Sequence, residues 1–149
     1  MTEIFNKEKQ QIIEEAIKEA ERATSGEIRL HVEEYCPANV LDRATEVFSS
    51  LEMQKTEERN GVLFYLALKD KQFAIIGDVG INRKMEDHYW GEIKDHLVSR
   101  FKNQEYVLGL KEAILMTGIQ MKDVFPAPGR EKNELLDDVS FGNNEHVVN

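Results

Sequence analysis

The chain has 149 residues and a formal net charge of −9, from 19 Lys and Arg residues against 28 Asp and Glu residues. About 41% of the residues are hydrophobic, which is enough for the core of one domain. The acidic surplus disfavours nucleic-acid binding and favours cations or a basic partner. Cys36 is the only cysteine, so an internal disulfide is excluded, and no Cys and His residues have the spacing of a zinc site.

The start of the sequence runs directly into charged residues and lacks the apolar segment of a signal peptide. No stretch approaches the ~18 apolar residues of a membrane-spanning helix. The sequence therefore predicts a soluble, cytoplasmic protein that does not insert into a membrane.

Two hydrophobic patterns occur near the start of the chain. Apolar residues at three- and four-residue intervals predict a helix over residues 7–24, with Asn6 as its N-cap and Gly26 as its stop. Residues 27–33 then alternate between polar and apolar, which is typical of a strand that turns one face to the core. The core-facing residues are expected to be Ile28, Leu30 and Val32.

The rest of the chain continues this α/β order. An uninterrupted apolar run over residues 62–68 predicts a strand that is covered on both faces. The other expected elements are a helix over 39–53, a hairpin strand over 73–76, and helices over 85–101 and 104–121. Pro126, Pro128 and Gly129 end the last helix, so the sequence divides into a domain over 1–125 and an acidic, loosely ordered tail over 126–149.

This order of elements brings polar residues together at one edge of the sheet. The helical crossover makes the first two strands parallel, and the hairpin makes the third antiparallel to the second. The starts of the first two strands and the end of the third therefore share an edge. Ser25 and Glu27, residues 58–61 and residues 78–80 are expected to be neighbours there.

The oxygen-bearing side chains of this edge suggest a divalent-cation site. Carboxylates and amide carbonyls are the ligands that calcium and magnesium prefer. The proposed ligands are Glu58, Asn60, Asp78 and Asp87, with Glu27 and Asn82 nearby. On spacing alone, the simpler interpretation is favoured, namely that Asn60-Gly61 and Gly77-Asp78-Val79-Gly80 are turns.

Covalent phosphatase mechanisms are disfavoured. A thiolate phosphatase requires Cys-x5-Arg, whereas Arg43 lies one position too far from Cys36 and beyond Pro37. An aspartyl-phosphate mechanism requires Asp-x-Asp, which does not occur in the sequence. Ser25 has no His or Asp placed by sequence to activate it.

Several short motifs together resemble the TPM domain family, which is named after a thylakoid lumen protein, a photosystem II repair protein and a nematode receptor auxiliary subunit. The resemblance covers about residues 5–125. The motifs that carry it are Thr24-Ser25-Gly26-Glu27-Ile28, Arg59-Asn60-Gly61-Val62-Leu63, Phe73-Ala74-Ile75-Ile76-Gly77-Asp78-Val79-Gly80-Ile81 and Phe125-Pro126.

The resemblance implies a three-layer α/β sandwich with a mixed sheet of about four strands. It also implies an acidic cleft associated with divalent cations and, in the chloroplast member, with acid phosphatase activity. Residues 80–87 match the length of the family segment that follows the third strand, and Gly80 and Asp87 match its ends. Two positions differ, because Arg59 replaces a family Asp and Asn82 replaces a frequent Glu.

Three functional hypotheses follow. The first is a cation-binding domain, with calcium or magnesium as cofactor and no organic cofactor, in which Arg59 turns aside to pair with Glu57 or Glu58. The second is a metal-assisted phosphatase in which Arg59 binds phosphate. The third is a protein-interaction module that uses the apolar and acidic tail residues 133–139.

Overall fold

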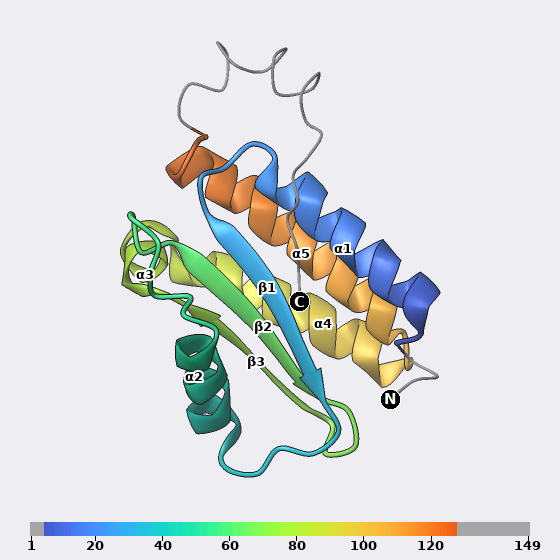
Figure 1. The fold of residues 1–149 in the computed structure, drawn as a ribbon. Helices are drawn as coiled ribbons and strands as arrows, with labels where there is room; N and C mark the ends of the chain where they lie inside the picture. Colours follow the sequence, from blue (N-terminus) through green and yellow to red (C-terminus); the bar gives the residue numbers. More distant parts are fainter. Residues whose placement is uncertain (1–4, 128–149) are drawn as a thin grey trace.

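Five helices and three strands make up the computed structural model, which describes residues 5–127 (Figure 1). In chain order these are α1 (Lys7–Glu21), β1 (Glu27–Glu33), α2 (Val40–Ser50), β2 (Gly61–Ala67), β3 (Gln72–Gly77), α3 (Val79–Lys84), α4 (Asp87–Lys102) and α5 (Tyr106–Val124). The predicted α/β sandwich is confirmed, although the sheet has three strands within the described residues instead of about four.

The strands are ordered β1-β2-β3. As predicted, β1 runs parallel to β2, with Glu27 opposite Gly61, and β3 runs antiparallel to β2, with Val62 opposite Gly77. All seven residues of the central strand β2 are buried. The starts of β1 and β2 and the end of β3 consequently lie at one edge of the sheet, next to α3 (Figure 1).

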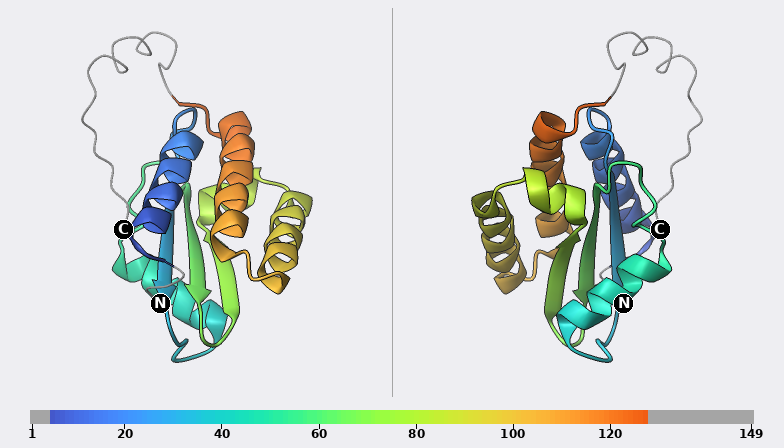
Figure 2. Two further views of the ribbon diagram at one scale, coloured as in Figure 1. Left: turned by 90° about the vertical axis from the view of Figure 1, so that its right-hand side faces the viewer. Right: turned by 90° about the vertical axis from the view of Figure 1, so that its left-hand side faces the viewer.

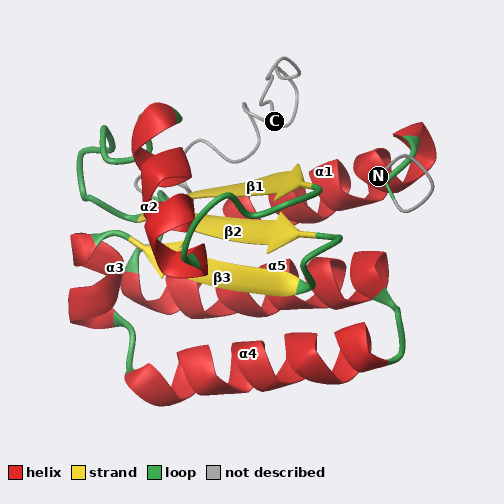
Figure 3. Cartoon of the chain, turned by 90° about the horizontal axis from the view of Figure 1, so that it is seen from below, coloured by secondary structure: helices red, strands yellow, loops and turns green. Residues whose placement is uncertain are grey.

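Helices cover both faces of the sheet. Helices α1, α4 and α5 lie on one side and α2 lies on the other (Figures 2 and 3). Because side chains alternate along β2, Val62, Phe64 and Leu66 enter the larger core, whereas Leu63 and Tyr65 enter a smaller core beneath α2. Ile28, Leu30 and Val32 of β1 face the larger core, as the alternating pattern predicts.

Helix α1 begins where the sequence indicates and ends earlier. The Asn6 side chain accepts a hydrogen bond from the Lys9 amide, 2.9 Å away, and so caps the helix. The helix stops at Glu21 and not at residue 24, because the Arg22 amide bonds to the Glu19 carbonyl and the chain then turns toward β1. The expectation that Gly26 stops the helix is therefore wrong.

Close packing joins the helices of the larger layer. A Cβ atom at Gly118 of α5 would lie 2.6 Å from the Cβ of Ala20, so glycine at this position lets α1 and α5 approach closely. Glu112 of α5 accepts hydrogen bonds from Arg100 of α4, with the shorter N–O distance 2.8 Å, and contacts the ring of His96. His96 thus takes part in a contact between helices.

Helix α3 is absent from the sequence prediction, which reads residues 77–80 as a turn. Asp78 is in fact the N-cap of α3, and its carboxylate accepts a hydrogen bond from the Val79 amide at 2.8 Å. The six-residue helix is too short for periodicity to reveal. The helix predicted to begin at residue 85 consequently begins at Asp87, after Met85 has ended α3.

No helix between residues 5 and 127 combines the length and the apolar character needed to cross a bilayer. The described chain ends with Pro126, which forms an isolated bridge with Thr24, and with Ala127, whose amide bonds to the Ala23 carbonyl. The rest of the predicted tail lies outside the described residues, and its role in interactions stays a prediction.

Candidate functional site

The polar segments that topology assigns to one edge of the sheet are in contact with one another. The Ser25 hydroxyl donates to Glu58 Oε1 at 2.7 Å, and the Asn60 side-chain amide donates to Ser25 Oγ at 3.1 Å. The Glu27 amide bonds to the Asn60 carbonyl, which joins the start of β1 to the start of β2. We refer to Ser25, Glu58, Asn60, Arg59 and Asp78 as the sheet-edge cluster.

Arg59 forms the most extensive polar contact of the cluster. Its Nε and Nη2 atoms donate to the two carboxylate oxygens of Asp78 at 2.7 and 2.8 Å. The Asp78 side chain is 5% exposed, whereas that of Arg59 is 47% exposed. The hydrogen bonds to Asp78 raise the pKa of Arg59 above its usual value. The expected pairing of Arg59 with Glu57 or Glu58 is therefore wrong, because Asp78 lies within reach once α3 has formed.

Backbone contacts hold the segment that contains Glu58 and Arg59 against the start of α3. Arg59 has a φ of 52°, which places its backbone in the left-handed region. Its carbonyl accepts a hydrogen bond from the Gly80 amide at 2.9 Å, so α3 packs directly against the segment that precedes β2. A Cβ atom at Gly80 would lie 2.2 Å from the Glu58 carbonyl oxygen. Gly80 therefore permits a close backbone approach that no other residue allows.

Three predicted site residues stand apart from these contacts. Glu27 pairs with Arg29 at 3.2 Å. The Asn82 side-chain amide donates to the Gly77 carbonyl at 3.0 Å, inside the β3–α3 connection. Asp87 is exposed at the first position of α4 and makes no polar contact with the cluster in the described part of the chain. Among residues 5–127, no group of three or more His, Cys, Asp or Glu side chains is arranged to hold a metal ion.

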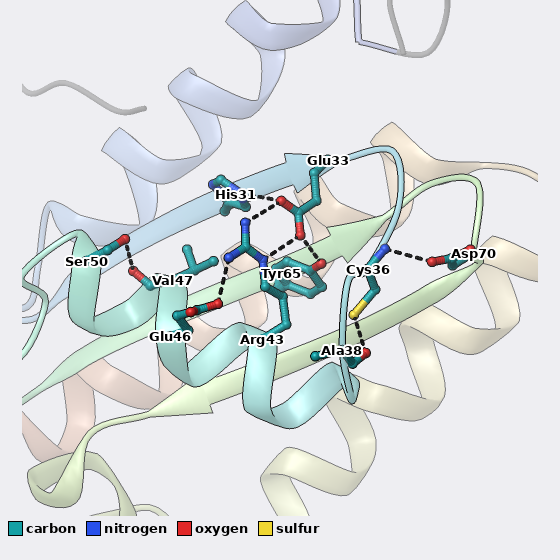
Figure 4. Close-up of polar contacts among 10 residues, drawn as sticks. All are labelled: His31, Glu33, Cys36, Ala38, Arg43, Glu46, Val47, Ser50, Tyr65 and Asp70. Atoms are coloured by element: carbon teal, nitrogen blue, oxygen red, sulfur yellow. Dashed lines mark hydrogen bonds and ion pairs between the residues drawn. The ribbon is translucent and has the colours of Figure 1, made fainter.

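A second polar cluster lies on the α2 side of the sheet and centres on Glu33 (Figure 4). The Glu33 carboxylate accepts hydrogen bonds from Arg43 Nε and Nη2, each at 2.8 Å, and from the Tyr65 hydroxyl. His31 Nε2 lies 3.3 Å from Glu33 Oε1, and its ring stacks on that of Tyr65. We call these four residues the Glu33 cluster.

The ionisation of the Glu33 cluster follows from these contacts. The hydrogen bonds from Arg43, and then that from Tyr65, lower the pKa of Glu33 to about 2. Burial, followed by the hydrogen bond to Glu33, raises the pKa of Tyr65 above its usual range. The Glu33 carboxylate therefore faces the Arg43 guanidinium, its opposite charge. The hydrogen bonds of the cluster connect β1 and β2 to α2. Sequence reasoning missed it, although His31 and Glu33 lie on the polar face predicted for β1.

A partly buried carboxylate lies beside the start of β1. Glu21, the last residue of α1, accepts a hydrogen bond from the Ile28 amide at 2.7 Å. It thereby satisfies a backbone donor on the side of β1 that does not pair with β2. Burial raises the pKa of Glu21 to about 7, against the smaller opposing effect of this hydrogen bond. Glu21 therefore titrates near neutral pH.

This shift predicts how Glu21→Gln changes stability with pH. Between pH 4.5 and 7 the folded state keeps a proton that the unfolded state has released, so wild-type stability falls as the pH rises. Glutamine does not titrate. The stability of the variant relative to wild type should therefore increase by about 2 kcal/mol across this window.

Urea unfolding at pH 4.5 and 7.5 measures this change. Glu19→Gln is the matched control, because Glu19 lies on the same helix with 61% of its side chain exposed. A Glu21→Gln effect that is independent of pH would contradict the prediction.

Comparison with known proteins gives a consistent result. The model of the TPM domain family matches residues 1–119. The NMR structure of the BA42 protein from the psychrophilic bacterium Bizionia argentinensis has 40% sequence identity and a TM-score of 0.76, covering 80% of this chain and 82% of that one. The N-terminal domain of a P. gingivalis protein, at 16% identity and a TM-score of 0.61, covers 95% of this chain and 82% of that one and is similar in fold alone. Comparison with curated proteins gives no match.

Proposed function

The chain belongs to the TPM domain family, and from that premise we propose that its sheet-edge cluster binds a divalent cation, either calcium or magnesium. The observation that carries the proposal is the Asp78 carboxylate, which is nearly buried and already faces a positive charge, the Arg59 guanidinium. The side chains of Glu58 and Asn60, which both contact Ser25 in the same cluster, also carry oxygen atoms, and hard cations prefer oxygen ligands.

These oxygen ligands can hold such an ion only if Arg59 moves away from Asp78. Both Asp78 oxygens accept hydrogen bonds from Arg59, so the ion must displace the guanidinium from the carboxylate. Arg59 is able to turn toward water because nearly half of its side chain is exposed. Glu58, Asn60 and Asp78 would then hold the ion, whereas Asp87, the fourth predicted ligand, makes no polar contact with them within residues 5–127. We therefore expect weak binding in which the ion competes with Arg59.

Titration of calcium or magnesium into the ¹⁵N-labelled chain tests the proposal. Amide signals of residues 58–60 and 77–82 should shift and reach saturation at millimolar concentrations of the ion. Asp78→Asn should abolish these shifts. Asp42→Asn, an exposed carboxylate on α2, should leave them unchanged. The absence of shifts in those segments with either ion would contradict the proposal.

Arg59→Asp is expected to tighten calcium binding. The change removes the competing positive charge and adds a carboxylate beside Asp78, so both effects favour a cation. We expect the dissociation constant to fall by about tenfold or more, with Arg59→Gln intermediate because it removes only the charge. Isothermal calorimetry measures the difference, and weaker calcium binding by Arg59→Asp would contradict the competition between Arg59 and the ion.

The alternative function is a metal-assisted acid phosphatase. It is favoured by the same exposed guanidinium, because arginine binds phosphate oxygens in the bidentate manner in which Arg59 binds Asp78. When bound, a metal ion would supply a Lewis acid for the phosphoryl oxygen. In this function Arg59 orients the phosphate, so Arg59→Asp should abolish phosphate binding.

Hydrolysis of an artificial aryl phosphate tests the alternative. Activity should disappear with a chelator and in Asp78→Asn. Hydrolysis that is indifferent to both treatments would argue against this function.

A further inference from the structure

A groove with an aromatic floor lies at the end of the sheet opposite to the sheet-edge cluster. It is formed where β2 ends and β3 begins, against the connection between α4 and α5, and Figure 3 shows these two connections at the same end of the molecule. Its volume is about 350 Å³, and its apolar lining includes Leu66, Leu68, Phe73, Phe101 and Tyr106. This volume lies within the range of small-ligand sites.

The aromatic rings form a continuous surface. The ring centroids of Phe73 and Phe101 are 5.5 Å apart in an edge-to-face arrangement, and those of Phe101 and Tyr106 are 5.1 Å apart. All three rings are only partly buried, so the apolar surface they form remains open. Such a surface favours an apolar chain over a polar ligand.

A second hollow, of about 400 Å³ and more polar, adjoins the groove along α4. It is lined by Asp95, Ser99 and Asn103, and it shares Val98 and Lys102 with the groove. Val98 and Lys102 therefore form the boundary between an apolar and a polar compartment. Lys71, in the β2–β3 turn, adds a second positive charge to the lining of the groove. Neither lysine forms an ion pair with a residue between 5 and 127.

We propose that the groove and the adjoining hollow together bind an aliphatic monocarboxylate. The hydrocarbon chain lies on the aromatic floor, and the carboxylate lies at the boundary, where the Lys102 ammonium is its counter-charge. Ser99 and Asn103 offer hydrogen-bond donors on the polar side. Asp95 opposes a second negative charge, so a monocarboxylate binds better than a phosphate monoester of the same chain length.

Decanoate is the test ligand, titrated below its micellar concentration into the ¹⁵N-labelled full-length chain. We expect saturable shifts of Phe73, Val98 and Phe101. Decanol, which lacks the charge, and decyl phosphate, which carries a second one, should each bind about fivefold or more weakly. Lys102→Gln should weaken decanoate binding by a similar factor, and Lys102→Arg should retain it. Lys94→Gln, on the same helix but outside both hollows, should have no effect.

Other outcomes would overturn the proposal. Shifts scattered over the whole domain, equal binding of decanol and decanoate, or indifference to Lys102→Gln would each do so. Phe141 is the aromatic residue of the segment 128–149, which lies outside the described residues. If Phe141→Ala alone moves the signals of the groove, the occupant of the groove is that segment. If those signals depend on protein concentration, the occupant is a second copy of the chain.

Discussion

Gly80→Ala is expected to destabilise the domain by about 3 kcal/mol, because the added methyl group has no space on α3. Its Cβ atom would lie 2.2 Å from the Glu58 carbonyl oxygen and 2.6 Å from that of Arg59. Both neighbours are backbone atoms and do not change rotamer, so α3 must move away from the chain that precedes β2. That movement also disturbs the pairing of Arg59 with Asp78.

Gly91→Ala is the matched control for this substitution. Gly91 lies in α4, and a Cβ atom there would have no neighbour within 4 Å. Alanine should stabilise that helix by about 0.5–1 kcal/mol, since it favours helical backbone more than glycine does. Urea unfolding of the two variants compares them directly. Equal effects of the two substitutions would show that α3 tolerates the displacement.

Glu33→Gln is expected to lower stability at neutral pH by about 2–3 kcal/mol. The substitution leaves Arg43 without its bidentate partner and removes the charge that the Tyr65 hydroxyl faces. The Glu33 and Arg43 side chains are 19% and 25% exposed, so their interaction is screened only in part. The loss should therefore exceed that of a surface ion pair.

The pH dependence gives this prediction a clear sign. The pKa of Glu33 is lowered to about 2 in the folded state, so its stabilising effect is complete above about pH 4.5 and is lost as the pH falls toward 2. Wild type and Glu33→Gln should therefore differ most at neutral pH and converge in acid. Glu46→Gln is the control, because Glu46 also pairs with Arg43 but is 69% exposed, and it should cost less than about 0.5 kcal/mol. A constant difference between pH 7 and pH 2 would contradict the assigned role of Glu33.

The fold was largely predictable because its strands have unambiguous patterns. The alternation over Glu27–Glu33 corresponds to a half-covered strand. The apolar run of β2 corresponds to a fully buried strand. Helix α3 was not predictable from local sequence. It contains a glycine at its second position, and its stability depends on the Asp78 cap and on contacts with Glu58 and Arg59, which are distant in sequence.

The candidate site was predictable in its location and not in its pairings. Topology places Ser25, Asn60 and Asp78 at one edge, and the contacts between these segments confirm that prediction. The partner of Arg59 depends on the direction of a long side chain from a left-handed backbone position, which no sequence pattern specifies. The same reason explains why the Glu33 cluster was missed, since Arg43 reaches it from α2 across the smaller core.

The hydrogen bonds of Phe125 place the end of α5 beside the sheet-edge cluster, which makes this end of the helix useful for attaching a fluorescent label. The Phe125 carbonyl accepts the Ser25 amide at 3.0 Å and the Thr24 hydroxyl at 2.5 Å, so α5 ends against the same loop that contributes Ser25 to the sheet-edge cluster. A fluorophore coupled to a cysteine that replaces Ala127 would therefore lie close to that loop, because the amide of residue 127 bonds to the Ala23 carbonyl. A fluorophore coupled to a cysteine that replaces Lys7, the exposed first residue of α1, would lie at the other end of that helix (Figure 1). The two labelling positions thus give a proximal and a distal reporter for the same binding experiment.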